Sequence, residues 1–331
     1  MVDRPKILIT QRIPDPAYPL LEAIGTVERN GVEGNIWSYT ELLQRGPGHD
    51  YVYSLLTDTI DARFLEACAH ATPRLRMVAN MAVGYNNIDV AAATRLGIAI
   101  SNTPGVLSDT TADLTFALLM AVARRIPEAE RFLRAGKFTG WGPLLFCGAE
   151  VSHATLGLIG AGRIGRLVAR RAMGFDMRVL YHNRTRMSQE DEQLYHVTYM
   201  PLDELLAQSD FVSVHVPYSS ATHHMIGERE LHRMKPTAFL INTARGPVVD
   251  EKVLVRALQE GEIAGAGLDV FENEPAVEPA LLQMENVVLL PHIASASLQT
   301  RTRMATMACD NIVAHASGQR PPNIINPEVL E

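Results

Sequence analysis

Three glycines in the middle of the chain have the spacing that lets a backbone turn approach a phosphate. Gly160, Gly162 and Gly165 form the pattern G-x-G-x-x-G at the end of the apolar run 155–160. A helical pattern begins near Arg163, so the turn lies between a predicted strand and a predicted helix. The first glycine permits the tight turn, the second admits a pyrophosphate, and the third allows the helix to pack closely on the strand. The N–H groups at the helix start face the phosphates, so the pattern predicts a dinucleotide-binding turn.

The strand after this turn bears on which dinucleotide fits. It spans 178–183 and ends at Asn183, where units that bind NAD usually carry Asp or Glu for the ribose hydroxyls. Such a carboxylate would repel the extra phosphate of NADP, and it is absent here. Arg184 and Arg186 instead supply guanidinium groups that can fork onto phosphate oxygens. We therefore expect a preference for NADP(H), with NAD(H) as the alternative if both arginines are solvated loop residues.

Predicted strands and predicted helices, which must position this turn, alternate along almost the whole chain. Short apolar runs separated by amphipathic stretches predict parallel sheets with helices on both faces. Two long helical patterns, 109–125 and 297–317, break the rhythm, and Ser297 is a suitable N-cap for the second. We expect them to connect two domains. Strands are expected at 6–10, 51–56, 75–81, 97–102, 155–160, 178–183, 211–216, 238–244, 265–270 and 287–292.

The two connecting helices predict that one domain is inserted into the other. Residues 101–296 would form the dinucleotide-binding Rossmann domain, and residues 1–100 with 297–331 the substrate domain. A chain of 331 residues suits two domains of about 150 residues, each with its own core. The expected fold class is α/β, with two Rossmann-like or flavodoxin-like doubly wound parallel-sheet domains and a cleft between them. The tail 318–330 is too rich in Pro and Asn for a helix.

Composition argues against several other classes of protein. A net charge of −7 gives no electrostatic reason to bind nucleic acid or an anionic membrane. Three cysteines without short spacing argue against a disulfide scaffold or a zinc site and suit a reducing cytosol. With no run of 18 apolar residues and no signal segment, we expect a cytoplasmic protein without a membrane partner. The adjacent His223 and His224 lie in a polar stretch, which favours a surface loop.

Several longer motifs, spread from about residue 75 to the C-terminus, have the form seen in one enzyme family. They are NMAVGYNNIDV (80–90), SNTPGVLSDTTADLTFALLMAVARR (101–125), AGKFTGWGP (135–143), INTARGPVVDE (241–251), AGLDVFENEP (266–275) and NVVLLPHIASAS (286–297). With these motifs the chain resembles the D-isomer-specific 2-hydroxyacid dehydrogenases. Within that family it is most similar to the glyoxylate/hydroxypyruvate reductases. Residues 1–70 match less distinctly.

The resemblance implies which residues would carry the reaction. It assigns catalysis to Arg245, Glu274 and His292, and binding of the substrate to the backbone of Val83 and Gly84 together with Arg245 and His292. It implies no metal, and it implies a homodimer. It assigns cofactor contacts to the glycine turn and to later loops, namely Gly160, Gly162, Arg163, Ile164, Gly165, Asn183, Arg184, Thr185, Thr243, Ala244, Arg245, Asp269, His292, Ile293 and Ala294.

These residue types suit the reduction of a 2-oxo acid. The reaction needs a hydride from a nicotinamide, a proton for the carbonyl oxygen, and a grip on the substrate carboxylate. His292 can supply the proton because imidazole titrates near working pH, and Glu274 would favour its charged form. Arg245 can bind the carboxylate or the carbonyl oxygen and stabilise developing charge. Arg245 follows a predicted strand and His292 ends one, and sites in α/β sheets gather at the carboxyl ends of strands.

We therefore expect an NADPH-preferring reductase that converts glyoxylate and hydroxypyruvate to glycolate and D-glycerate. Pocket size depends on loops that the sequence does not place, so a dehydrogenase for a bulkier keto acid or a sugar acid is the alternative. A non-catalytic nucleotide-sensing module, similar to the C-terminal-binding-protein corepressors, is a further alternative that the lack of long disordered extensions disfavours. Trp141 lies in an irregular glycine-rich stretch. It would either anchor the core or an interface, or line the substrate pocket of its own subunit or of the partner subunit.

Overall fold

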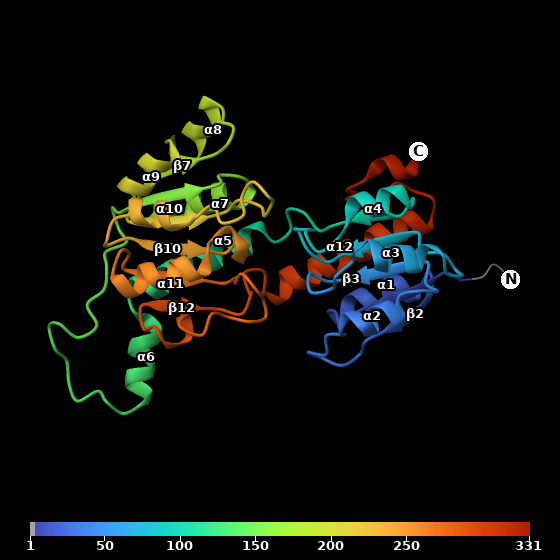
Figure 1. Cartoon of the computed structure of the whole chain (residues 1–331), viewed down its shortest axis with the longest axis horizontal. Helices are drawn as coiled ribbons and strands as arrows, with labels where there is room; N and C mark the ends of the chain where they lie inside the picture. The colour runs from blue at the N-terminus through green and yellow to red at the C-terminus, as the bar shows by residue number, and fades with distance from the viewer. Residues whose placement is uncertain (1–3) are drawn as a thin grey trace. The chain divides into compact units, whose positions relative to one another are not determined.

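The computed structural model describes residues 4–331 and consists of two compact units (Figure 1). The first unit runs to Leu107 and includes Ala296–Glu331, and the second unit comprises Ser108–Ser295. The chain leaves the first unit directly before helix α5 (Ser108–Ala123) and returns to it directly before helix α12 (Leu298–Ala316). Ser297 caps α12 as expected, because its side chain accepts a hydrogen bond from the N–H of Thr300.

The first unit is built on a parallel sheet of five strands in the order β2-β1-β3-β4-β5. The order reverses between β1 and β3, the type of point at which open α/β sheets bind ligands. Helices α1 and α12 pack together on one face, and α2, α3 and α4 cover the other. The elements are β1 (Lys6–Ile9), α1 (Tyr18–Glu22), β2 (Thr26–Arg29), α2 (Tyr39–Arg45), β3 (Tyr51–Ser54), α3 (Ala62–Ala69), β4 (Met77–Asn80), α4 (Val90–Arg95) and β5 (Ala99–Ser101).

The second unit is built on a parallel sheet of seven strands in the order β12-β11-β10-β9-β6-β7-β8. Helices α5 and α7 cover one face, and α9, α10 and α11 cover the other. The strands are β6 (Thr155–Ile159), β7 (Arg178–His182), β8 (Val197–Tyr199), β9 (Phe211–Val214), β10 (Phe239–Asn242), β11 (Gly265–Leu268) and β12 (Val287–Leu289). The helices are α5, α6 (Ile126–Arg134), α7 (Arg163–Ala172), α8 (Gln189–Leu194), α9 (Leu202–Gln208), α10 (Glu228–Arg233) and α11 (Glu251–Glu260).

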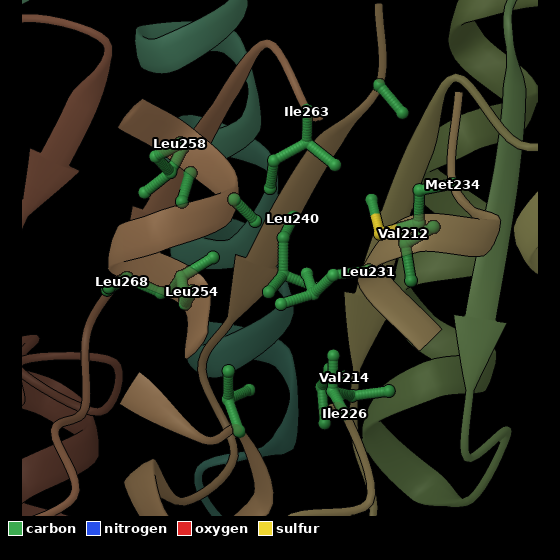
Figure 2. Close-up of a cluster of buried hydrophobic side chains, with 14 of the residues drawn as sticks. Val212, Val214, Ile226, Leu231, Met234, Leu240, Leu254, Leu258, Ile263 and Leu268 are labelled. Atoms are coloured by element: carbon green, nitrogen blue, oxygen red, sulfur yellow. The ribbon is translucent and has the colours of Figure 1, made fainter. Parts of the chain in front are cut away.

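Burial on both faces explains why the strands of this sheet are continuous apolar runs. In β10, Leu240 faces the core under α10 and α11, and its neighbour Ile241 faces the core under α5 and α7. Figure 2 shows Leu240 among Leu231 of α10 and Leu254 of α11. Successive strand residues point to opposite faces, so a strand covered on both sides cannot alternate with polar residues. This confirms the parallel α/β fold class.

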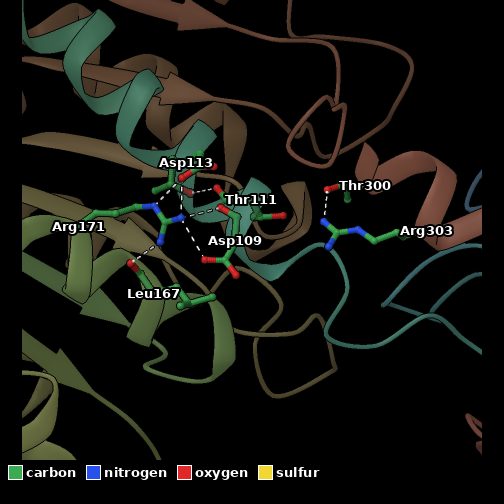
Figure 3. Close-up of polar contacts among 8 residues, drawn as sticks. Asp109, Thr111, Asp113, Leu167, Arg171, Thr300 and Arg303 are labelled. Carbon is green, nitrogen blue, oxygen red and sulfur yellow. Dashed lines mark hydrogen bonds and ion pairs between the residues drawn. The ribbon is translucent and has the colours of Figure 1, made fainter. Parts of the chain in front are cut away.

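Ion pairs join the two helices on the α5 face. Arg171 of α7 donates to Asp113 of α5 through Nε at 2.7 Å, and its Nη2 lies 3.2 Å from Oδ1 of Asp109 (Figure 3). The aspartates are exposed, so each pair contributes little by itself. Together they fix α7, which follows the glycine turn, against α5.

Three features differ from the expectations. Strands β2 and β8 are additional, and the tail contains one 3₁₀ turn (Pro327–Leu330). Both extra strands are short and lie at a sheet edge, and most β2 residues are exposed, so neither needs an apolar run. The last strand ends at Leu289, three residues before His292, which leaves that histidine in a loop. Among residues 4–331, no helix has the length and apolarity that crossing a bilayer requires.

Candidate active site

The order of the strands brings three distant segments of the chain to one edge of the second sheet. Strands β10, β11 and β12 are neighbours and parallel, so their carboxyl ends lie side by side. Arg245 follows β10, Glu274 lies in the turn after β11, and His292 follows β12. All three lie in the second unit.

His292 and Glu274 form a hydrogen-bonded pair. Nδ1 of His292 lies 2.8 Å from Oε2 of Glu274, whose other oxygen accepts the N–H of Phe271 at 3.0 Å. Burial alone would raise the pKa of Glu274. The hydrogen bond and charge of His292, with smaller contributions from Phe271 and Arg245, lower that pKa below its ordinary value. Glu274 is therefore a carboxylate at neutral pH, and Nε2 of His292 is the ring nitrogen without a hydrogen-bond partner in the described chain.

Asp269, at the end of β11, shapes the loop that carries His292. Its carboxylate accepts the N–H groups of Ile293 at 2.7 Å and Ala294 at 2.8 Å, and its carbonyl accepts the N–H of His292 at 2.9 Å. His292 has a φ of 54°, a left-handed conformation that is uncommon for a residue with a side chain. Asp269 is fully buried, and its carboxylate holds this strained loop in place. The N–H groups of Ile293 and Ala294 are likewise committed within the protein.

The backbone segment that contains Arg245 packs closely against the turn that contains Glu274. A Cβ on Gly246 would overlap the backbone of Phe271, so only glycine allows the Arg245 segment to lie against the turn that carries Glu274. Burial lowers the pKa of Arg245 and the charge of Glu274 opposes this change. An arginine keeps its charge under such a shift because its ordinary pKa is so high. The site therefore contains a fixed guanidinium beside a carboxylate–imidazole pair.

The three glycines of the turn are needed for different reasons, because two of them lie against other backbone atoms and the third faces open space. Gly160 has a φ of 96°, and a Cβ there would lie 2.8 Å from the carbonyl carbon of His215. A Cβ on Gly165 would overlap the carbonyl oxygen of Gly160. A Cβ on Gly162 would meet no atom within 4 Å. The protein itself therefore gives no reason for glycine at 162, whereas a pyrophosphate approaching the backbone does, so the turn fits a dinucleotide.

The first turn of α7 suits the same group. Arg163 is exposed at the start of this ten-residue helix, and its N-cap Gly162 offers no side chain to the N–H groups that begin it. Those groups can therefore donate to phosphate oxygens. Ile164 packs against the apolar core under α5 and α7, so its side chain serves the fold.

The polar residues of the loop after β7 differ in whether the protein already binds their side chains. Asn183 accepts the N–H of Ala161 at 2.7 Å and so ties the loop to the glycine turn. Arg186 donates from Nε and Nη2 to the two oxygens of Glu192, at 2.7 and 2.8 Å. Glu192 also accepts the Tyr181 hydroxyl, and the two partners lower the pKa of Glu192 to about 2. The two arginines are thus not equivalent, because Arg186 is already held by a carboxylate.

Arg184 and Thr185 complete this loop. Both are exposed, and Arg184 forms no ion pair with any residue in 4–331. Arg184 is therefore the guanidinium of this loop that stays available for a phosphate. Thr243 and Ala244, expected beside the cofactor, are tied into the fold: Thr243 is buried with its hydroxyl 2.8 Å from that of Thr115, and the Ala244 N–H donates to the side chain of Asn242.

The backbone expected to hold the substrate carboxylate lies in the first unit. The carbonyl of Val83 accepts a hydrogen bond from Asn102 at 2.8 Å, and the carbonyl of Gly84 accepts one from Asn80 at 3.2 Å. Among residues 4–331, no acceptor forms a hydrogen bond with the backbone N–H group of Val83 or of Gly84. The two asparagines thus bind the carbonyl groups of Val83 and Gly84. The two N–H groups remain as hydrogen-bond donors that suit an anion. The described residues contain no group of three or more His, Cys, Asp or Glu side chains that could hold a metal ion.

The amino-acid sequence of the chain matches one protein family over more than half its length. The model for "D-isomer specific 2-hydroxyacid dehydrogenase, NAD binding domain" matches residues 116–294. The glyoxylate reductase of Korarchaeum cryptofilum is 50% identical over 336 residues, covering 99% of this chain and 98% of that protein. The glyoxylate reductase of Thermococcus litoralis is 46% identical over 337 residues, with the same two coverages.

Solved structures agree with the sequence match. A glyoxylate reductase from Paecilomyes thermophila has a TM-score of 0.86 at 33% identity, covering 99% of this chain and 100% of that one. The NADPH-dependent glyoxylate/hydroxypyruvate reductase of Sinorhizobium meliloti, in complex with NADP and malonate, has a TM-score of 0.83 at 35% identity, covering 98% and 97%. The likeness extends over both units and confirms the resemblance read from the motifs. This chain belongs to the D-isomer specific 2-hydroxyacid dehydrogenases, a family of NAD(P)-dependent oxidoreductases.

Proposed function

We propose that this enzyme is an NADPH-preferring reductase that converts glyoxylate to glycolate and hydroxypyruvate to D-glycerate. The observation that carries the proposal is the arrangement of Arg245, Glu274 and His292 at one sheet edge, with Nε2 of the histidine left open. The names of the relatives at 46–50% identity support glyoxylate as a substrate, and the name of the Sinorhizobium meliloti reductase supports hydroxypyruvate as well.

The residues have distinct roles in this proposal. When bound, a reduced nicotinamide would supply a hydride for the carbonyl carbon. His292 gives a proton from Nε2 to the carbonyl oxygen, while Glu274 orients the ring through its hydrogen bond to Nδ1. Arg245 stabilises the negative charge that develops on the substrate oxygens. The N–H groups of Val83 and Gly84 hold the substrate carboxylate.

The cofactor preference rests on the loop after β7. The position where a carboxylate would hold the ribose is Asn183, whose side chain is engaged with Ala161, and the loop then offers the exposed Arg184. A guanidinium there can pair with the 2′-phosphate of NADPH, and no carboxylate at 183 repels it. We therefore favour NADPH, with NADH as the weaker substrate.

An apolar arm, residues 126–148, supports a homodimer. The arm consists of α6 and the loop that follows it, drawn in green in Figure 1. Trp141 and Leu144 are each 84% exposed, and Leu133 and Phe138 are also exposed. This exposure excludes a core anchor for Trp141 and leaves an interface or a substrate pocket. Apolar side chains gathered on one segment mark an interaction surface, and we propose that a second copy of the chain covers them.

The cytoplasm is the compartment that best suits the chain. Cys68, Cys147 and Cys309 are all free thiols, and two of them are buried. Free cysteines are usual where glutathione and thioredoxin keep thiols reduced.

A panel of 2-oxo acids with NADPH tests the proposed activity directly. Oxidation of NADPH is followed by its near-ultraviolet absorbance with glyoxylate, hydroxypyruvate, pyruvate, a branched keto acid and a sugar keto acid. We expect the highest kcat/KM for glyoxylate or hydroxypyruvate. A clear preference for a bulkier acid would favour the alternative dehydrogenase, and tight NADPH binding without any turnover would favour a nucleotide-sensing module.

A further inference from the structure

We propose that His224 is a positioning residue for the reaction, because it links the segment that carries Arg245 to the turn that carries Glu274. The polar stretch around this histidine predicts a surface loop, but the structure places its ring between two carboxylates. The inference rests on the proposed function, and it concerns how the site keeps its geometry rather than which groups react.

The side chain of His224 bridges two elements. Nε2 lies 2.9 Å from Oε1 of Glu272, in the turn after β11, and Nδ1 lies 3.5 Å from Oδ2 of Asp250. Asp250 is the N-cap of α11 and accepts the N–H of Val253 through its other oxygen. The ring is therefore attached on one side to the turn that carries Glu274 and on the other to the start of α11.

The backbone of His224 is attached to the Arg245 segment. Its N–H donates to the carbonyl of Pro247 at 2.9 Å, two residues beyond Arg245. Ile226 forms a bridge with Val249 in the same region. His224 also has a φ of 49°, so the loop adopts an uncommon backbone conformation to present this ring. Main chain and side chain thus join the segments on both sides of the close contact at Gly246.

Carboxyl groups gather around the His224 ring. Glu251 is buried, and its carboxylate accepts the N–H groups of Glu272 and Glu278, each at 2.8 Å. Asp250 and Glu272 add two more carboxyl groups to the same small region. Among residues 4–331, neither of these two forms an ion pair with Lys or Arg. Like charges in a partly buried cluster repel, and the His224 ring lies between these two carboxyl groups.

Loss of the bridge should displace Arg245 relative to Glu274 and His292. Errors of about 1 Å in a catalytic arrangement can cost about 100-fold in rate. The glycine turn and the loop after β7 follow other strands, so the part of the cofactor site that holds the phosphates should not change. We therefore expect a loss in kcat without a loss in NADPH binding.

The test compares three variants of the full-length enzyme. His224→Leu removes both contacts and should lower kcat roughly 10- to 100-fold, with the Kd for NADPH, measured by fluorescence, within about twofold of wild type. His224→Gln puts an amide N–H near the position of Nε2 and should recover most of kcat. His223→Leu is the matched control, because His223 is exposed and its ring contacts Tyr218 and His224 without linking the two segments. It should leave kcat within about twofold.

A double-mutant cycle and hydrogen exchange make the outcome decisive. Glu272→Leu should lower kcat to a similar extent, and adding it to His224→Leu should cost little more, because both remove one link. The amide N–H groups of the non-proline residues in 245–249 and 271–275 should exchange faster in His224→Leu than in His223→Leu. Unchanged kcat and exchange in His224→Leu, or fully additive effects, would overturn the proposal. If His224→Leu does not fold, a kcat of His224→Gln below a tenth of the wild-type value overturns it, and recovery supports it.

The proposed function can fail separately. If wild-type enzyme turns over no 2-oxo acid, the proposed activity is wrong. The exchange comparison then decides alone whether His224 joins the two segments.

Discussion

The two arginines after β7 illustrate how neighbours decide what a residue can bind. The spacing of Arg184 and Arg186 suggests two equal phosphate ligands. In the structure Arg186 is bidentate to Glu192, whose carboxylate also holds Tyr181, whereas Arg184 is exposed. Freeing Arg186 would break two charge-assisted hydrogen bonds. We therefore expect Arg184 to supply most of the discrimination between NADPH and NADH.

Matched alanine variants test this division. Arg184→Ala should raise the Kd for NADPH about 10- to 100-fold, since a hydrogen bond to a charged group contributes about 1.5–3 kcal/mol. The same change should alter NADH binding by less than about threefold. Arg186→Ala should change the ratio of the two Kd values much less, and fluorescence titration measures all of them. A larger effect on this ratio from Arg186→Ala would show that Glu192 releases Arg186 to the phosphate.

His215 gives a pH dependence to stability. This residue follows β9 beside Gly160, and burial lowers the pKa of its imidazole from 6.5 to about 4. The unfolded chain takes up a proton below about pH 6.5, whereas the folded chain does so only near pH 4. Because the unfolded state binds more protons in between, the free energy of unfolding should fall as the pH falls from about 6.5 to about 4.

His215→Gln checks this sign. Glutamine stays neutral and keeps a polar group near Ser213, which lies 2.9 Å from the imidazole. Between about pH 7 and about pH 5 the wild-type Tm should fall more than that of the variant. The gap should be a few degrees, since about 1 kcal/mol shifts the Tm of such a domain by about 2–4 °C. Parallel losses in the two proteins would assign the acid sensitivity to other groups.

Residue types predicted which groups of the site could do chemistry, but not which of their atoms are already engaged in hydrogen bonds. Arg245, Glu274 and His292 could be identified from motifs, and the structure brings them together in one unit. The engagement of Asn183 and Asp269 by backbone N–H groups depends on loops that meet only after folding. Glycine directly after Arg245 was a usable signal for the close contact at Gly246, and nothing in the polar stretch indicated the partners of His224.

At the scale of elements, different glycines of the turn are needed for folding and for binding the cofactor. Gly165 must be glycine because the Gly160 carbonyl lies against it, whereas Gly162 faces open space. The structure therefore predicts opposite defects for two similar substitutions in one turn.

Gly162→Ala and Gly165→Ala test this separation. Gly162→Ala should keep the wild-type Tm but raise the Kd for NADPH roughly 5- to 100-fold, because overpacking against a ligand costs about 1–3 kcal/mol. Gly165→Ala should lower the free energy of unfolding by about 1–3 kcal/mol, because a backbone carbonyl cannot move aside as a side chain can. Thermal melts and fluorescence titrations measure both. Wild-type NADPH affinity in Gly162→Ala would reject the proposed placement of the pyrophosphate.

The strands could be predicted where the sheet is covered on both faces. Leu240 and Ile241 face opposite cores, so the run that contains them is apolar throughout. The edge strands β2 and β8 escaped prediction because backbone pairing rather than apolar burial defines them. Their absence from the expected set did not affect the site, which depends on the order of β10, β11 and β12.

At the scale of the whole molecule, the apolar arm 126–148 predicts self-association. Trp141→Ser with Leu144→Ser removes two apolar side chains that are each 84% exposed and contribute little to the core of one chain. Light scattering should give the wild-type protein a mass near twice the 36.4 kDa of one chain. The double variant should dissociate at concentrations at least roughly 100-fold higher, since burying each such side chain contributes about 1.5–3 kcal/mol and about 1.4 kcal/mol corresponds to a tenfold change in Kd. A monomeric wild-type protein would contradict the dimer.

The same variant shows whether the arm also serves catalysis. If Trp141 lines the substrate pocket of the partner subunit, kcat/KM should fall as the dimer dissociates. If it only anchors the interface, dissociated chains should keep their kcat/KM.

The most direct test of the account is the His292→Ala variant, assayed for both turnover and cofactor binding. Loss of a general acid costs about 10²- to 10⁴-fold in rate. His153→Ala, at an exposed histidine of the same unit, serves as the control. We expect His292→Ala to lose kcat to that extent with glyoxylate and NADPH while the Kd for NADPH stays within about twofold of wild type. Full turnover by His292→Ala would contradict the assignment of the proton donor, and with it the account of the site.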